Sequence, residues 1–333
     1  MFETTLGWTP LQAVRIDLRG RPHTACFKLE SANPTGSSKD RTASAILQVM
    51  HAERPLSPGD VVVESTSGNL GIALAHLLNQ IGCRLIAVTD PNTSTDIRRT
   101  LEAEGVEVQV VDEPDGHGGY LLNRLRRVRD LRTANPAYRW GNQYENPANP
   151  AVHERTTGPE ILAQAGAGLD AVYVAVSTGG TLSGISRFLR ANAPSVTVVA
   201  VDAHGSRATG GEAGPRLLSG IGASRISSFL DDGAYDAVKM VSDADSFALC
   251  RILRDDTGLR LGGSSGSVLA ALLDDLRGNT PPRHPVCLMP DGGERYEHTF
   301  YDDAWLMSHQ AFDAVCQAEK ELRGDGLAFT LSD

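Results

Sequence analysis

Lys39 is the residue of this chain whose position most favours covalent chemistry. It closes the segment NPTGSSK at residues 33–39, in which Asn-Pro-Thr-Gly predicts a turn and the two serines are candidate helix caps. Lys39 would then stand at a helix start, where the helix dipole disfavours its protonated form. A lysine with a lowered pKa suits Schiff-base chemistry. A surface lysine at a capped helix explains this segment, taken alone, equally well.

Three further segments combine glycine with hydroxyl side chains just before an expected helix. They are ESTSGNLG at 64–71, STGGT at 177–181 and GGSSG at 262–266. Backbone N–H groups at a helix N-terminus bind anions, and glycine permits close approach of a ligand. Each segment alone could also be a capped turn. Their occurrence together favours a site for carboxylate and phosphate groups.

Other cofactor and metal signatures are weak in this sequence. Residues 165–171 (AGAGLDA) resemble a dinucleotide-binding pattern, but they follow an expected helix rather than a strand. The five cysteines are scattered and form no CxxC pair, which favours reduced thiols in a cytosolic protein. Paired aspartates at 231–232, 274–275 and 302–303 are expected on the surface. We therefore expect neither a metal ion nor a dinucleotide.

The elements that must position these segments alternate between short apolar strands and longer helices. Strands are expected at 24–30, 61–64, 84–89, 106–111, 171–176, 196–201, 238–241 and 285–289, and helices at 39–53, 70–81, 94–104, 118–133, 154–166, 181–191, 245–256 and 266–276. Continuously apolar strands are typical of parallel sheets that are covered on both faces. The pattern predicts an α/β fold with two doubly wound, mostly parallel sheets.

Composition limits the partners of the chain. Of its 333 residues, 41% are hydrophobic and 22% are charged, as in ordinary globular proteins. A net charge of -10 disfavours a nucleic-acid surface. We see neither a signal peptide nor an apolar run long enough to span a bilayer. Small molecules are the expected ligands, with no nucleic acid and no membrane as partner.

Taken together and in this order, the segments resemble those of the fold type II pyridoxal-phosphate (PLP) enzymes, the cysteine synthase and cystathionine β-synthase group, whose architecture is that of the tryptophan synthase β-subunit. The resemblance runs from about residue 7 to 300. It implies that Lys39 carries the cofactor and removes the Cα proton, that Asn69 lies beside the 3′-oxygen of PLP, and that Ser264 faces the pyridine nitrogen. The phosphate of PLP is then held by the loop of Ser177, Thr178, Gly179, Gly180 and Thr181.

The same resemblance implies a site for the substrate α-carboxylate. Its expected residues are Ser65, Thr66, Ser67, Gly68, Asn69 and Gln143. A serine at the pyridine nitrogen would not keep that nitrogen protonated, so the ring is a weaker electron sink. This favours β-elimination to an aminoacrylate followed by addition of a nucleophile, with PLP supplying the electronic chemistry.

The resemblance also implies domains that move. We expect a smaller, mobile domain at 40–150, a larger domain from 1–39 and 151–309, and a C-terminal tail at 310–333 with one helix. Closure over the substrate would exclude water. A homodimer is expected from the resemblance alone.

Departures from the O-acetylserine enzymes suggest the substrate. Tyr144 and Ser177 stand where those enzymes usually have Phe and Gly, and Arg225 follows Gly220 in a loop that resembles the one bordering the active-site mouth. Arginine suits phosphate, so we hypothesise O-phospho-L-serine. Residues 221–231 more closely resemble synthases of 2,3-diaminopropionate pathways for siderophores and peptide antibiotics, which join O-phosphoserine to L-glutamate. Arg124 and Arg225 are candidates for the carboxylates of glutamate.

Several alternatives stay open. Arg225 could be a solvated loop residue, Tyr144 a packing residue, and Arg124 part of a solvated helix face. The enzyme could be a cysteine synthase that uses sulfide. A serine dehydratase is disfavoured because those enzymes usually have a tetraglycine run in place of STGGT. A regulatory pseudoenzyme is disfavoured by the presence of Lys39, Asn69 and Ser264.

Overall fold

The computed structural model describes residues 6–116 and 119–332. Its strands are β1 (Leu11–Leu18), β2 (Arg21–Leu29), β3 (Val61–Ser65), β4 (Arg84–Thr89), β5 (Glu107–Val110), β6 (Arg139–Trp140), β7 (Ala171–Ala175), β8 (Thr197–Ala203), β9 (Ala237–Val241), β10 (Pro285–Met289) and β11 (Ala328–Leu331). Its helices are α1 (Lys39–Glu53), α2 (Asn69–Asn79), α3 (Thr95–Ala103), α4 (Leu121–Ala134), α5 (Ala148–Arg155), α6 (Thr157–Ala165), α7 (Gly180–Asn192), α8 (Asp243–Thr257), α9 (Gly263–Leu276), α10 (Asp303–Ser308) and α11 (Phe312–Gly324). None of the helices within the described ranges is both long and apolar enough to cross a membrane.

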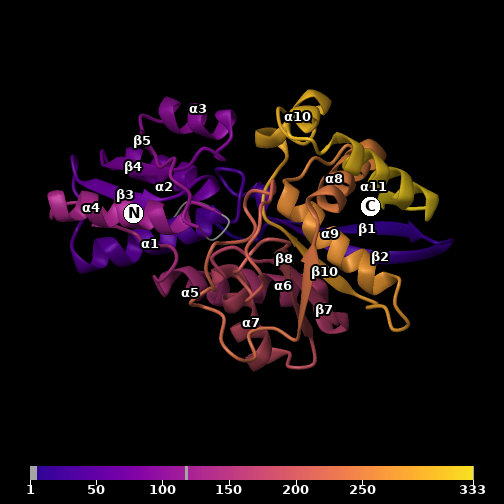
Figure 1. Cartoon of the computed structure of the whole chain (residues 1–333). Coiled ribbons are helices and arrows are strands. Elements are labelled where there is room, and N and C mark those ends of the chain that lie inside the picture. The colour runs from indigo at the N-terminus through magenta and orange to yellow at the C-terminus, as the bar shows by residue number, and fades with distance from the viewer. Residues whose placement is uncertain (1–5, 117–118, 333) are drawn as a thin grey trace.

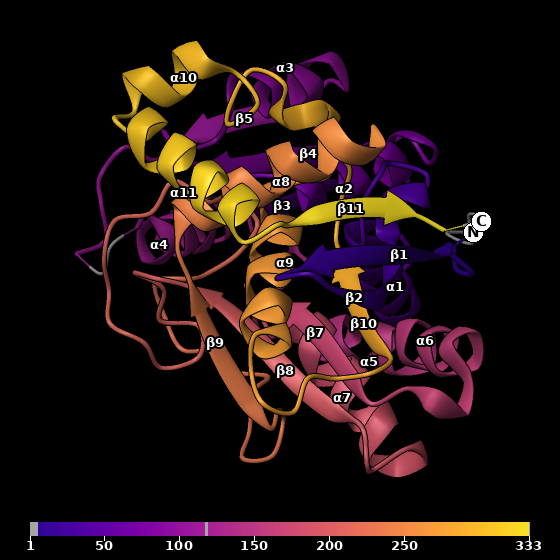
Figure 2. The same ribbon diagram turned by 90° about the vertical axis from the view of Figure 1, so that its right-hand side faces the viewer.

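The strands form two sheets that lie in different halves of the molecule (Figure 1). The larger sheet has seven strands in the order β11-β1-β2-β10-β7-β8-β9, and Figure 2 shows them fanning across that half. The smaller has four strands in the order β5-β4-β3-β6. All pairs are parallel except those that β1 makes with β11 and β2. The prediction of two mostly parallel sheets is confirmed.

The larger sheet is covered on both faces. On one face, Ile16 and Phe27 belong to a core with Leu253 of α8 and Leu269 of α9. On the other face, strands β7 and β8 share a core with α6 and α7. Because both faces are buried, β7 and β10 read as continuous apolar runs.

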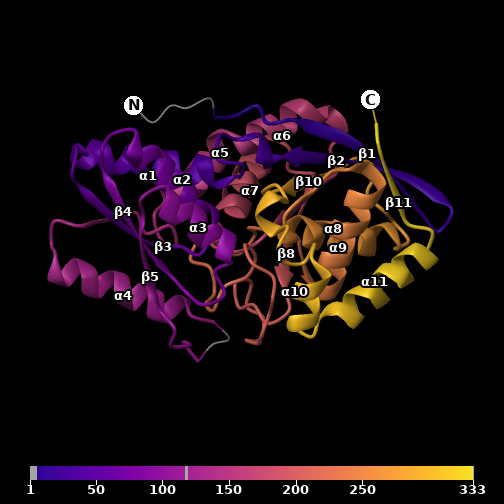
Figure 3. The same cartoon turned by 90° about the horizontal axis from the view of Figure 1, so that it is seen from above.

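The smaller sheet has its own cores. Val62 packs with Ile46 of α1 and Leu74 of α2 on one face, while Val63 packs with Val128 of α4 on the other. Figure 3 shows α1 and α2 on one side of this sheet and α4 on the opposite side. Helix α5 contacts both α1 and α7, and so links the two halves.

Most expected elements are present with ends shifted by a few residues. The helix expected at 154–166 is present as α6, which begins only at Thr157 because Thr156 adopts φ -125° and ψ -70° and separates it from α5. Residue 118, where the helix 118–133 was expected to start, lies outside the described residues, and α4 begins at Leu121. Strands β1, β6 and β11 were not expected.

Candidate functional site

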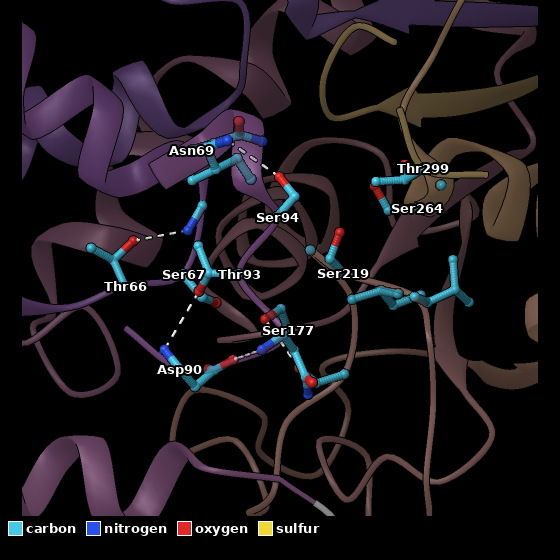
Figure 4. A pocket seen from close by; sticks show the side chains of 18 of the residues that line it. Thr66, Ser67, Asn69, Asp90, Thr93, Ser94, Ser177, Ser219, Ser264 and Thr299 are labelled. Carbon is cyan, nitrogen blue, oxygen red and sulfur yellow. Dashed lines mark hydrogen bonds between the residues drawn. The ribbon is translucent and has the colours of Figure 1, made fainter. Parts of the chain in front are cut away.

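A cavity of about 720 Å³ lies where the carboxyl ends of β3, β4, β7 and β10 meet. Sites of this size and at this edge of parallel sheets commonly bind small molecules. Figure 4 shows that polar side chains from both halves surround it: Thr66 and Asn69 from the smaller sheet's half, and Ser177, Ser219 and Ser264 from the larger one's.

Lys39 lines this cavity as the first residue of α1. The turn before it is fixed by Asp40, whose carboxylate accepts hydrogen bonds from the amide and hydroxyl of Thr35 at 3.0 and 2.9 Å. The Lys39 amino group forms no hydrogen bond or ion pair with the described residues. Desolvation by the surrounding protein lowers the pKa of Lys39, against the opposing charges of Asp291 and Glu30. Burial is therefore the main cause of the lowered pKa.

Residues Thr66, Ser67, Gly68 and Asn69 line the cavity between β3 and α2, as the sequence suggested for a carboxylate site. The Thr66 hydroxyl accepts a hydrogen bond from the amide of Gly71 at 3.1 Å and so shapes the helix start. The turn places the N-terminus of α2 against the cavity, which favours an anion.

Ser65 takes a different position from its neighbours. It is fully buried as the last residue of β3 and is not among the residues that line the cavity. Its carbonyl oxygen accepts a hydrogen bond from Nε2 of Gln143 at 2.8 Å. Gln143 itself lines the cavity, so Ser65 fixes a neighbour of the site.

The loop at 177–181 brings only Ser177 to the cavity lining; Thr178, Gly179, Gly180 and Thr181 are not among the lining residues. Gly179 has φ +86°, a left-handed conformation that favours glycine, and α7 begins at the next residue. The N–H groups of Thr178, Gly179 and Thr181 have no hydrogen-bond partner among the described residues. Unpaired amides at a helix start are suited to bind an anion.

His153 connects this loop to the helix of Lys39. Its Nε2 lies 3.2 Å from the hydroxyl of Thr181 and 3.3 Å from that of Thr42 in α1. Its Nδ1 lies 2.9 Å from the hydroxyl of Thr157. Burial holds the pKa of His153 well below its usual value, so the ring is neutral and links these hydroxyls without adding charge.

Ser264 and Gly220 face the cavity from the larger sheet's half. Ser264 is 3% exposed at the start of α9, and its hydroxyl has no hydrogen-bond partner among the described residues. Gly220 adopts φ +79°, and a Cβ there would lie 4.0 Å from Oγ of Ser264. The serine hydroxyl is therefore available to a ligand.

Arg124 lines the cavity, although a run of arginines like the one around it is more often a solvated helix face. It is 6% exposed and pairs with Asp90, with 3.1 Å between Nη1 and Oδ2. Its Nε and Nη1 are buried and make no hydrogen bond. Buried donors without an acceptor are costly unless a ligand supplies one.

Tyr144 also lines the cavity, and the positive charge of Arg124 acts on its phenol. Burial raises the pKa of the Tyr144 phenol, against the lowering effect of the Arg124 charge. The phenol is therefore a neutral donor beside a guanidinium. The hydroxyl of Ser177 also faces this cavity and donates to the carbonyl of Gly222 at 3.2 Å.

The structure does not bring Arg225 into the cavity lining. Its guanidinium pairs with Glu145 at 3.0 Å and lies 5.6 Å from the centre of the Tyr144 ring.

Two other residues that the sequence did not single out do line the cavity, Arg216 and Asp291. Asp291 lies two residues after the end of β10, where a polar residue is a usable signal. Arg216 is one of three arginines in the glycine-rich segment between β8 and β9, and no spacing rule separates them.

No cluster of histidine, cysteine or acidic side chains that could hold a metal ion occurs in residues 6–116 and 119–332.

The model of the family described as "Pyridoxal-phosphate dependent enzyme" matches residues 2–291. A relative from Ralstonia nicotianae named N-(2-amino-2-carboxyethyl)-L-glutamate synthase is 42% identical over 301 residues, covering 90% of this chain and 89% of the relative. A relative of the same name from Cupriavidus metallidurans is 41% identical over 315 residues, covering 93% and 92%.

Two solved structures share this fold over most of their length. O-ureido-L-serine synthase superposes with a TM-score of 0.81 at 32% identity, covering 91% of this chain and 97% of the other. The O-acetylserine dependent cystathionine β-synthase from Helicobacter pylori gives a TM-score of 0.79 at 28% identity, covering 88% and 95%.

Proposed function

Because the chain belongs to the pyridoxal-phosphate dependent enzyme family, we propose that it replaces the phosphate of O-phospho-L-serine with the amino group of L-glutamate. The relatives named N-(2-amino-2-carboxyethyl)-L-glutamate synthase support this product. In the reaction the Cβ–O bond breaks and phosphate leaves with the bonding electrons. The nitrogen of glutamate forms the new bond to Cβ and releases one proton.

The residues around the cavity fit PLP. Lys39 presents an amine with a lowered pKa and no competing partner, and Ser264 presents a free hydroxyl. The unpaired amides of the loop at 177–181 match the phosphate group. When bound, PLP supplies an electron sink for the substrate Cα.

Lys39 also suits the proton transfers of the reaction. A neutral amine can accept the Cα proton and later return it. The burial that lowers its pKa favours the neutral form. The substrate carboxylate would lie at the N-terminus of α2, against Thr66, Ser67 and Asn69.

The observation that carries the choice of phosphoserine is the state of Arg124. Its Nε is buried without an acceptor, and its Nη1 forms an ion pair with Asp90 but no hydrogen bond. A phosphate oxygen would satisfy these donors with charge-assisted hydrogen bonds. Tyr144 lines the same cavity and can add a neutral donor, whereas the hydroxyl of Ser177 already donates to the carbonyl of Gly222. An acetyl leaving group would leave this cluster unmatched.

The test is a mass-spectrometric product assay with pure protein loaded with PLP. Phosphoserine, O-acetylserine and serine are each offered with glutamate or with sulfide. We expect the glutamate adduct and an equal amount of inorganic phosphate from phosphoserine, with much less product from O-acetylserine. Cysteine as the main product in the sulfide arms, with no glutamate adduct, would show a cysteine synthase instead.

A further inference from the structure

We propose that Arg216 binds a carboxylate of the amino-acid nucleophile and thereby selects an acidic amino acid as second substrate. The inference rests on the proposed replacement reaction and adds to it the residue that chooses the nucleophile. The guanidinium of Arg216 has an environment that differs from that of Arg124.

Arg216 reaches the cavity from the long segment between β8 and β9. Its Nη1 donates to the carbonyl of Gly205 at 2.9 Å, which anchors one side of the guanidinium. Its Nε lies beside Gly222, where an added Cβ would come within 2.9 Å of it. Gly222 also has φ +80°, so glycine both shapes the turn and leaves room for the arginine.

No carboxylate among the described residues forms an ion pair with Arg216. The acids whose charges act on it are Asp202, Asp243 and Asp115. All three already accept hydrogen bonds, Asp115 from the amides of residues 119 and 122. Asp202 accepts hydrogen bonds from the amide and hydroxyl of Thr209, and Asp243 accepts from the amides of residues 217 and 218. Burial lowers the pKa of Arg216, although the charges of these acids oppose the shift. A ligand carboxylate would supply the missing partner in a bidentate pair.

The position of Arg216 relates it to the reacting carbon. Gly222, which touches its Nε, accepts a hydrogen bond from the hydroxyl of Ser177. Ser177 lines the cavity together with Tyr144 and Arg124, where we place the leaving phosphate. The incoming amine must approach the carbon that the phosphate leaves, so the carboxylates of the nucleophile must lie near this group.

Accessibility separates the roles of the two arginines. Arg124 is 6% exposed, as suits a contact to a group that arrives already attached to the first substrate. Arg216 is only partly buried, and its neighbours Ser219 and Gly220 are exposed while they line the cavity. A second substrate that enters after phosphate has left would contact Arg216 and these exposed neighbours before it reaches Arg124.

The decisive experiment compares the two Michaelis constants in Arg216→Gln and Arg216→Lys. In Arg216→Gln, we expect KM for glutamate to rise roughly 10- to 100-fold, since a charged hydrogen bond is lost. KM for phosphoserine should change less than about 2-fold, because Arg124 holds the phosphate. Arg216→Lys should recover part of the glutamate affinity. Arg187→Gln, an exposed arginine on α7, is the control.

A binding measurement makes this independent of turnover. Calorimetric titration of PLP-loaded protein should show that glutamate binds more tightly than glutamine in wild type and that Arg216→Gln removes the difference. Equal KM values for glutamate in wild type and variant would overturn the proposal, and so would an equal rise in KM for phosphoserine. If wild type forms no glutamate adduct, the proposed function fails, and the calorimetric difference alone then decides the role of Arg216. Retention of the circular dichroism spectrum excludes misfolding as the cause.

Discussion

Asn69 and Asp291 join the two halves of the molecule through one hydrogen bond, from Nδ2 of Asn69 to Oδ2 of Asp291 at 2.7 Å. Asn69 begins α2 beside the smaller sheet, whereas Asp291 follows β10 of the larger sheet. The same carboxylate oxygen accepts from the hydroxyl of Tyr296 at 2.6 Å. Burial raises the pKa of Asp291, although both donors oppose the shift. The carboxylate therefore fixes the wall of the cavity where the two halves meet.

Replacing Asp291 with Ala should destabilise the protein by about 2–3 kcal/mol, because the buried donors of Asn69 and Tyr296 lose their acceptor. Urea unfolding followed by circular dichroism measures the loss. Asp274→Ala is the matched control: its side chain is 67% exposed and pairs with Lys239, which also contacts Asp275. We expect less than about 0.5 kcal/mol there. Similar losses in both variants would contradict the role of Asp291.

Lys39→Ala should abolish the covalent attachment of the cofactor and lower turnover by roughly 10³-fold or more, because the base is removed as well. Borohydride reduction and peptide mapping of wild type should place the pyridoxyl label on the peptide that contains Lys39. Lys239→Ala removes a half-buried, ion-paired lysine that does not line the cavity and should keep the label. A label on any other lysine would refute the assignment.

Arg124→Gln should raise KM for phosphoserine by roughly 10- to 100-fold, because the phosphate loses a charge-assisted contact. Turnover of O-acetylserine, where measurable, should change little. Arg126→Gln is the control, since Arg126 is exposed on the same helix. Steady-state kinetics with each first substrate decides the point. An unchanged KM in Arg124→Gln would mean that the leaving group lies elsewhere.

Glu64 should make stability depend on pH. It is fully buried on β3, and burial raises its pKa from 4.5 to about 7, although Trp140 and the amide of Ser65 favour its charged form. Between these two values the folded protein keeps a proton that the unfolded chain has lost. The stability that comes from the raised pKa is thus fully present below about pH 4.5 and is lost as the pH rises through about 7.

The matched variant is Glu64→Gln, which cannot ionise. Relative to this variant, wild type should lose roughly 2.5 kcal/mol of unfolding free energy between pH 5 and pH 8, from 1.36 kcal/mol per pKa unit. Urea unfolding of both proteins across this range measures the difference. Parallel pH profiles for the two proteins would show that Glu64 titrates normally.

Local patterns predicted the buried elements well. Strand β4 and helix α1 lie at the expected residues, because apolar runs and turn residues are local signals. The side chain of Ser38, a candidate cap, makes no capping hydrogen bond. Strand β1 was missed although Val14, Ile16 and Leu18 alternate with less buried residues, as in a half-buried strand. Strand β11 is short and exists through its pairing with β1, a contact that no local pattern encodes.

Site residues that belong to a recognisable sequence motif were predictable. Those whose side-chain direction depends on contacts with distant residues were not. Lys39, Asn69 and Ser264 come to one cavity, as their motifs suggested. Arg225 and Arg216 share a segment with few regular elements, and side chains nearby decide which one faces the cavity. Glu145 holds the guanidinium of Arg225 outside it, and this ion pair joins residues 80 positions apart.

The arrangement of the larger sheet has a consequence for synthesis of the chain on the ribosome. Strands β1 and β2 emerge early and can pair with each other across the turn at residues 19–20. Their outer edges, however, pair with β11 and β10, which are made some hundreds of residues later. An isolated hairpin is only marginally stable, and open edges invite pairing between chains. The nascent protein therefore carries unpaired edges through most of translation, so its yield in cells should depend on chaperones that shield them.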